Sequence, residues 1–215
     1  MALANYTDLR QAIADWLNRT DLTDFIPDYI RLAEGTLNRV MRNTRMVASG
    51  SITTSVLNVD APTDMLEPLL LAVTSTGIPL EQVSPEQLIM LRRSRCRTAG
   101  TPRFYCVIGR KIELAPTPSG STSMTLQYYQ AIPPLESNAT NWLLTYNPDL
   151  YLYTALMHAA PFLKDDARAA LFSNFLTQQV QAAVQQNTTA SFDLAKTPGF
   201  SLDTPSDPPR AQAIG

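Results

Sequence analysis

Apolar side chains recur at helical spacing at both ends of the chain, and the first such stretch is residues 5–19. One face of this predicted helix, at the i, i+3, i+4, i+7 and i+8 positions, consists of Leu9, Ala12, Ile13, Trp16 and Leu17. A second stretch predicts a helix over about residues 24–45. Its apolar face consists of Ile26, Tyr29, Ile30, Ala33, Leu37, Val40 and Met41.

The second predicted helix has two further features. Acidic residues lie early in it, and Arg39, Arg42 and Arg45 lie late, which complements the helix dipole. Gly35 falls in its middle, where a glycine costs about 1 kcal/mol relative to alanine. A close approach of another helix at this position would explain the glycine.

The pattern changes at Ser49 and Gly50 from helical spacing to alternation among β-branched residues. Residues from about 48 to 135 therefore predict a β-rich insertion of roughly six strands. The insertion includes a hairpin about Gly109 and Arg110 and a short helix at residues 84–94.

Helical spacing returns within residues 141–166, which hold the single histidine, His158. Asn147 and Pro148 form a helix start signal, and Pro161 marks a kink or an end. Apolar residues lie on more than one side of this helix, so we expect it to pack centrally between two partners. A last helix follows, with its stripe at Phe172, Phe175, Leu176, Val180, Ala183 and Val184.

From Asn187 onward, four prolines occur and no helical or strand period continues. Such a segment cannot bury enough apolar surface to offset its ordering entropy. Residues 187–215 are therefore predicted to form an extended arm. Its candidate anchors on a partner are Phe192, Phe200 and Leu202.

Together these elements predict an α+β fold. Helices from residues 1–47 and 140–186 are expected to meet as one helical bundle domain, because each has an apolar face that needs a partner. Residues 48–139 are expected to form a β-rich insertion domain between them, and residues 187–215 the extended C-terminal arm.

Composition narrows the class of protein. The net charge is −2 over 215 residues, so no overall positive field argues for nucleic-acid binding. The 17 basic residues are 14 Arg and 3 Lys, and arginine suits ordered contacts and interfaces. Cys96 and Cys106 form no C-x-x-C pair, and we expect free thiols and no metal site. We expect neither a signal peptide nor a membrane span.

Motifs for nucleotide binding, serine hydrolysis or zinc-dependent proteolysis do not occur. A Ser–His or Cys–His dyad would have to use His158, which lies in mid-helix among Tyr, Leu, Met and Ala. We expect this histidine to be packed inside the subunit or at an interface. The sequence therefore predicts that the protein is not an enzyme and has no catalytic residue, cofactor or metal ligand.

Two arginine clusters are the candidate site residues. The first lies near the end of the second predicted helix, and the second lies in the RRSRCR segment; together they comprise Arg39, Arg42, Arg45, Arg92, Arg93, Arg95 and Arg97. Clustered guanidinium groups suit DNA phosphates or an acidic protein surface. A solvated loop and a dipole-matched helix end are a third interpretation, and the sequence leaves all three open.

The order of several segments resembles the head-to-tail adaptor, or connector, proteins of short-tailed and related tailed bacteriophages. The segments are YTDLRQAIADWLNRTDLTDFIPDYIRLAEGTLNRVMR, IELAPTPSG followed by LQYYQAIPPL, and TNWLLTYNPDLYLYTALMHAAPFLKDD. Together they span about residues 5–186. Their order and spacing are more specific than any one of them alone.

This resemblance implies a structural virion protein at the head–tail junction, synthesised in the bacterial host cytoplasm. Copies of such a protein form a ring, usually a dodecamer, beneath the portal protein. The ring extends the DNA channel and docks the tail. The expected partners are other copies of this chain, the portal, tail nozzle or fibre proteins and, without specificity, genomic DNA in the lumen; no membrane is expected. The alternative is a DNA-binding or packaging-associated module that uses the arginine clusters.

Overall fold

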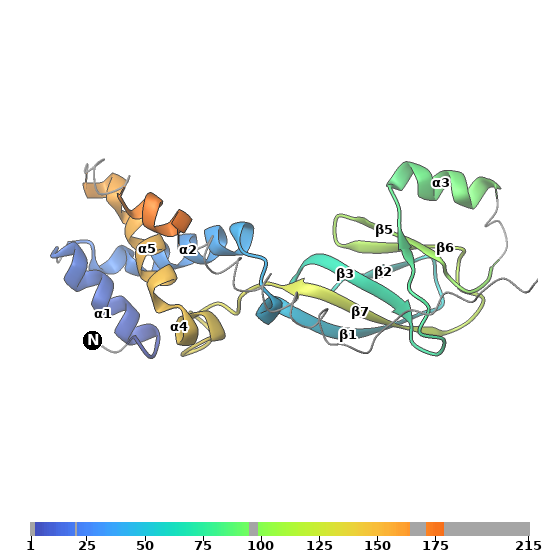
Figure 1. Cartoon of the computed structure of the whole chain (residues 1–215), viewed down its shortest axis with the longest axis horizontal. Coiled ribbons are helices and arrows are strands. Elements are labelled where there is room, and N and C mark those ends of the chain that lie inside the picture. Colours follow the sequence, from blue (N-terminus) through green and yellow to red (C-terminus); the bar gives the residue numbers. More distant parts are fainter. Residues whose placement is uncertain (1–2, 20, 95–98, 164–170, 179–215) are drawn as a thin grey trace, which may run out of the picture.

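The computed structural model describes residues 3–19, 21–94, 99–163 and 171–178. Figure 1 shows an elongated molecule with helices at one end and β-sheets at the other. Segments from both ends of the chain build the helical end, and the middle of the chain builds the sheets. The expected α+β fold is therefore confirmed. The arm expected at 187–215, with Phe192, Phe200 and Leu202, lies outside the described residues.

Helix α1 (Tyr6–Leu17) begins where the sequence provides a cap. The side-chain oxygen Oδ1 of Asn5 accepts a hydrogen bond from the backbone N–H of Asp8 at 2.9 Å, which satisfies one of the free N–H groups at a helix start. The predicted apolar face is buried except at one position. Trp16 is 51% exposed, because its ring lies at the edge of the face against Tyr153 rather than in the core.

Helix α2 (Ile26–Val40) follows a short 3₁₀ turn, η1 (Thr23–Phe25), and ends five residues earlier than its sequence pattern predicts. Met41 already has extended backbone angles, and a second 3₁₀ turn, η2 (Thr44–Met46), leads into the first strand. Arg42 stops the helix by donating hydrogen bonds to carbonyl oxygens at its end. The expected place of Arg42 and Arg45 on the helix is therefore wrong.

Two other expectations for α2 also need correction. Val40, which the periodicity places on the apolar face, is 49% exposed. At Gly35, a Cβ atom would meet no other atom within 4 Å. No close helix approach therefore explains this glycine within the described part of the subunit.

The second helical segment is split into two helices, α4 (Trp142–Tyr146) and α5 (Pro148–Leu163). The sequence pattern did not reveal α4, which Asn141 caps by accepting a hydrogen bond from the N–H of Leu144 at 2.9 Å. Helix α5 starts at Pro148 as predicted and continues through Pro161. It is buried on several sides, as expected for a central packing helix, at Leu150, Tyr151, Leu152, Ala155, Leu156, Ala159 and Ala160.

Residues 171–178 are helical, in agreement with the last predicted helix. Phe172 and Leu176 are buried against the helical core, whereas Phe175 is 39% exposed. The rest of the predicted stripe, at Val180, Ala183 and Val184, lies outside the described residues.

Seven strands, rather than six, form two sheets in the described part of the insertion. The first sheet has the order β1 (Val47–Thr54), β7 (Thr122–Gln130), β3 (Met65–Val73), and both of its strand pairs are antiparallel. The second has the order β2 (Asn58–Asp60), β6 (Lys111–Ala115), β5 (Phe104–Ile108), β4 (Glu81–Gln82).

The predicted β5–β6 hairpin is confirmed. Its two-residue turn pairs Ile108 with Lys111, and Gly109 adopts a positive φ of 62°, which favours glycine. The inner faces of the two sheets share one apolar core, which includes Leu71, Leu126 and Ile112. Helix α3 (Pro85–Ser94) covers the outer face of the four-stranded sheet (Figure 1).

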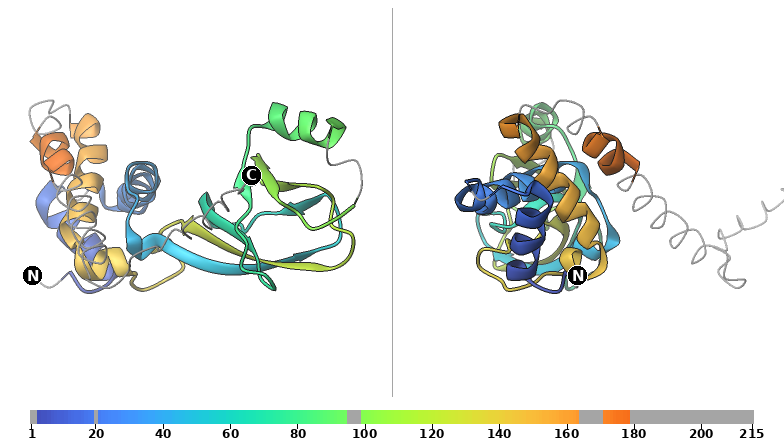
Figure 2. Two further views of the ribbon diagram at one scale, coloured as in Figure 1. Left: turned by 45° about the vertical axis from the view of Figure 1, so that its right-hand side comes forward. Right: turned by 90° about the vertical axis from the view of Figure 1, so that its left-hand side faces the viewer.

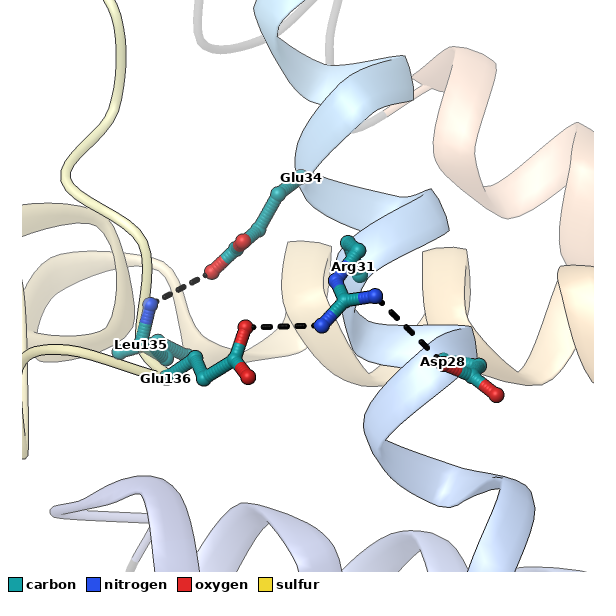
Figure 3. Close-up of polar contacts among 5 residues, drawn as sticks. All are labelled: Asp28, Arg31, Glu34, Leu135 and Glu136. Atoms are coloured by element: carbon teal, nitrogen blue, oxygen red, sulfur yellow. Dashed lines mark hydrogen bonds and ion pairs between the residues drawn. The ribbon is translucent and has the colours of Figure 1, made fainter.

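The return of the chain from the sheets to the helices is fixed by polar side chains of α2. The Oδ1 atom of Asn38 accepts a hydrogen bond from the N–H of Ile132 at 2.9 Å. The buried carboxylate of Glu34 accepts one from the N–H of Leu135 at 2.8 Å (Figure 3). Beside it, Arg31 and Glu136 form an exposed ion pair at 2.9 Å, which contributes little to stability.

We expect Glu34→Ala to lower the free energy of unfolding by about 1–3 kcal/mol, because it leaves the buried N–H of Leu135 without an acceptor. Glu34→Gln keeps an acceptor oxygen and should cost less. Chemical denaturation followed by circular dichroism measures both variants. Equal losses for the two variants would contradict this role of Glu34.

The same carboxyl group makes stability depend on pH. Burial raises the pKa of Glu34, and the hydrogen bond from Leu135 offsets only part of that effect. The unfolded carboxyl group therefore loses its proton at a lower pH than the folded one, and stability falls as pH rises from about 4.3 through the raised pKa. Unfolding measured against pH should show this fall relative to Glu34→Gln, and parallel curves would contradict it.

Candidate functional site

Arg42 joins the helical end to the sheets. Its guanidinium group donates to the carbonyl oxygens of Asn38 at 2.9 Å and Met41 at 2.7 Å, which lie at the end of α2. Its Nε atom donates to the Glu67 carboxylate on β3 at 3.2 Å, and the group lies 5.8 Å from the ring centre of Tyr129 on β7. Arg42 thus contacts both parts of the molecule at their junction.

The other two arginines of the first cluster have different partners. Arg39 donates to the hydroxyl oxygen of Thr36 at 3.1 Å, at the surface of α2. The guanidinium carbon of Arg45 lies 3.8 Å from the ring centre of Tyr146 on α4, a cation–π contact. The three guanidinium groups do not converge on one anion site.

The described arginines of the second cluster, Arg92 and Arg93, lie on α3, at the end of the sheets far from the helices (Figure 1). Arg92 donates to the Glu113 carboxylate at 2.9 Å and to the carbonyl of Leu114 at 3.0 Å, so it ties α3 to the sheet. Its neighbour Arg93 is exposed. Arg95 and Arg97 lie outside the described residues. Among the described arginines, the structure therefore does not bring the two clusters together.

His158 lies half-buried between α5 and α2. Its Nε2 atom is 3.0 Å from the hydroxyl oxygen of Thr36. Burial, and then the positive charge of Arg39, lower the pKa of His158, so the ring is neutral at pH 7. This environment is that of a packed, hydrogen-bonded histidine beside the outer surface of α2.

Groups suited to metal or thiol chemistry are sparse in the part of the chain that the structure describes. It holds no cluster of three or more His, Cys, Asp or Glu side chains that could bind a metal ion. Cys106 is a buried free thiol under α3, and burial raises its pKa, which disfavours the reactive thiolate. Cys96 lies outside the described residues.

Exposed aromatic rings on the helical end were not identified as candidate residues from the sequence. Tyr153 on α5 is contacted edge-on by Trp16, with ring centres 6.1 Å apart, and is stacked with Phe175 at 5.4 Å. Phe162, also on α5, is stacked with Phe25 at 6.4 Å, and both of these rings are largely exposed. Helical spacing alone assigns such residues to a core and cannot show that they reach the surface.

The geometry thus defines a class: a two-part α+β protein whose helical end has exposed apolar surfaces. Among the described helices, none is long and apolar enough to cross a membrane. A family model described as SU10 adaptor protein matches residues 4–198. The chain therefore belongs to this family of phage adaptor proteins, which confirms the resemblance to head-to-tail adaptors. A search of curated proteins finds no match.

Membership of this family supports a structural role in a bacteriophage particle and interaction with other virion components. An adaptor of this kind is a structural phage protein. Its functional sites are accordingly expected to be contact surfaces, to which the exposed side chains of the helical end are suited.

Neighbouring arginines on α3 allow a matched test of these placements. Arg92→Met removes the donors to Glu113 and Leu114, and should lower the free energy of unfolding by about 1–3 kcal/mol. Arg93→Met changes an exposed side chain and should stay within about 0.5 kcal/mol of the wild type. Thermal and chemical unfolding measure both variants. A larger loss for Arg93→Met than for Arg92→Met would contradict the assignment.

Proposed function

We propose that this protein is a head-to-tail adaptor whose copies form a ring beneath the portal, extend the DNA channel and dock the tail. The observation that carries the proposal is that apolar side chains are exposed on different sides of the helical end. Trp16 and Phe175 lie around Tyr153 on one side of α5, and Leu32 lies on the outer surface of α2. A ring subunit needs two such surfaces, because each copy contacts two neighbours through different patches.

The elongated shape suits the remaining partners. The helical end and the sheet end are separated along the long axis (Figure 1; Figure 2, left view). One end can therefore contact the portal while the other contacts tail nozzle or fibre proteins. The resemblance to short-tailed phage adaptors supports a copy number of twelve and a location at the head–tail junction of the virion.

Contact with genomic DNA in the lumen is a minor part of this proposal. Arg42 and Arg92 are engaged by carboxylates and carbonyls of their own subunit, which leaves fewer guanidinium groups for phosphates. Arg93 is the described arginine of α3 that is most accessible to DNA. This distribution favours an adaptor ring over a dedicated DNA-binding module.

Mixing the full chain with assembled portal from the same phage tests the proposed function. We expect a complex of one portal ring with about twelve adaptor copies, because the resemblance implies a dodecamer and heterologous contacts between copies can close into a ring. Native mass spectrometry counts the copies, and electron microscopy locates them. The proposal fails if the chain stays monomeric with portal present and is absent from purified virions.

A further inference from the structure

No contact within the described part of its own subunit explains why a glycine occupies position 35. Gly35 lies in the middle of α2, is exposed, and has nothing within 4 Å of the position that a Cβ atom would occupy. Glycine loses more conformational freedom on helix formation than alanine does, so it destabilises a helix interior. Alanine would fit the isolated subunit without any clash. The glycine therefore points to a neighbour that approaches from outside.

The surroundings of Gly35 form a surface that can receive a large side chain. Leu32, at 52% exposure, and Arg39 lie within about one turn of Gly35, on the same side of α2. We call Leu32, Gly35 and Arg39 the α2 outer face. It combines an exposed apolar side chain, an open space at the glycine, and a positive charge that has no carboxylate partner among the described residues.

A complementary surface exists elsewhere on the helical end. Trp16 projects from α1 at 51% exposure and is supported edge-on by Tyr153, which also stacks with Phe175. Asp15, next to Trp16, is exposed and makes no ion pair with any described residue. We call Asp15, Trp16, Tyr153 and Phe175 the Trp16 face. It combines a large aromatic side chain with a negative charge.

These two faces lie on opposite sides of α5. Tyr153 belongs to the Trp16 face, whereas Phe162, nine residues later on α5, contacts Tyr29 of α2. At 3.6 residues per turn, nine residues correspond to about two and a half turns, so the two rings point in opposite directions. The right-hand view of Figure 2 looks onto the helical end, with α1 and α5 in front of the sheets. Two different faces on opposite sides suit a head-to-tail contact between copies.

We propose that the α2 outer face of one subunit receives the Trp16 face of a second copy. The Trp16 ring occupies the space above Gly35 beside Leu32, and Asp15 forms an ion pair with Arg39. The inference rests on the proposed ring and names the surfaces that join its neighbours. His158, which is hydrogen-bonded to Thr36, then lies beside the contact between subunits.

Gly35→Ala tests the contact because it should change two properties in opposite directions. In the free subunit, alanine should raise the thermal midpoint by about 2–4 °C, because it favours the helix. In the assembly, the added methyl group meets the Trp16 ring and should weaken association at each contact about tenfold or more. Gly120→Ala, at an exposed turn of the sheets with no neighbour within 4 Å, is the matched control and should leave assembly unchanged.

Charge reversal provides a second test of the contact. Arg39→Glu should impair assembly on portal, and Asp15→Arg in the same chain should restore it, because each contact pairs residue 39 of one copy with residue 15 of the next. Light scattering and native mass spectrometry with portal measure both effects. If the wild-type chain assembles and Gly35→Ala assembles equally well, this contact is overturned but the ring is not. The same conclusion follows if the wild-type chain assembles and the double charge reversal does not restore assembly. No wild-type assembly on portal overturns the proposed function itself, and this contact with it.

Discussion

The structure depends on how α2 holds the returning chain. The sheets are inserted between the two helical segments, so the helical end must be assembled from residues about a hundred positions apart. Asn38 and Glu34 make this possible by accepting hydrogen bonds from Ile132 and Leu135, 94 and 101 positions later in the sequence. An unpaired backbone N–H is costly in a buried position, so these two side chains also fix the path of the chain. The segment then leads directly into α4 and α5.

This arrangement explains why the helical end has so much apolar surface left. Helix α5 lies in the centre and packs against α1, α2 and α4, so much of its own surface is covered. The helices around it have one face toward α5 and another toward solvent. In a monomeric protein the solvent face is expected to be polar, yet Trp16 and Phe175 are exposed together around Tyr153. Exposed apolar groups near one another indicate a contact surface, which is what a phage adaptor requires.

The sequence predicts much of the fold because local signals determine most elements. Pro148 starts α5, Gly109 turns the β5–β6 hairpin, and helical spacing marks the buried faces of α1 and α2. It does not predict the end of α2, because Arg42, which donates to carbonyl oxygens at that end, also contacts Glu67 and Tyr129 on distant strands. Tertiary contacts of this kind leave no periodic pattern.

Candidate site residues were harder to predict than the fold. A cluster of arginines looks the same in a sequence whether it binds a phosphate, a partner or its own subunit, and Arg92 contacts Glu113 and Leu114 of its own subunit. In the same way, helical spacing places Trp16 on an apolar face without showing that its ring lies outside the core. Gly35 gave the most specific indication of a contact surface, because no contact within the subunit explains a glycine in mid-helix.

Electron cryo-microscopy of the intact virion, at a resolution that shows side chains at the head–tail junction, tests the adaptor ring and the contact between its copies in one experiment. We expect a ring of this chain directly beneath the portal, with α2 of each copy against Trp16 of its neighbour. A ring in which the outer surface of α2 faces solvent would contradict the proposed contact. A head–tail junction without this chain would contradict the adaptor function.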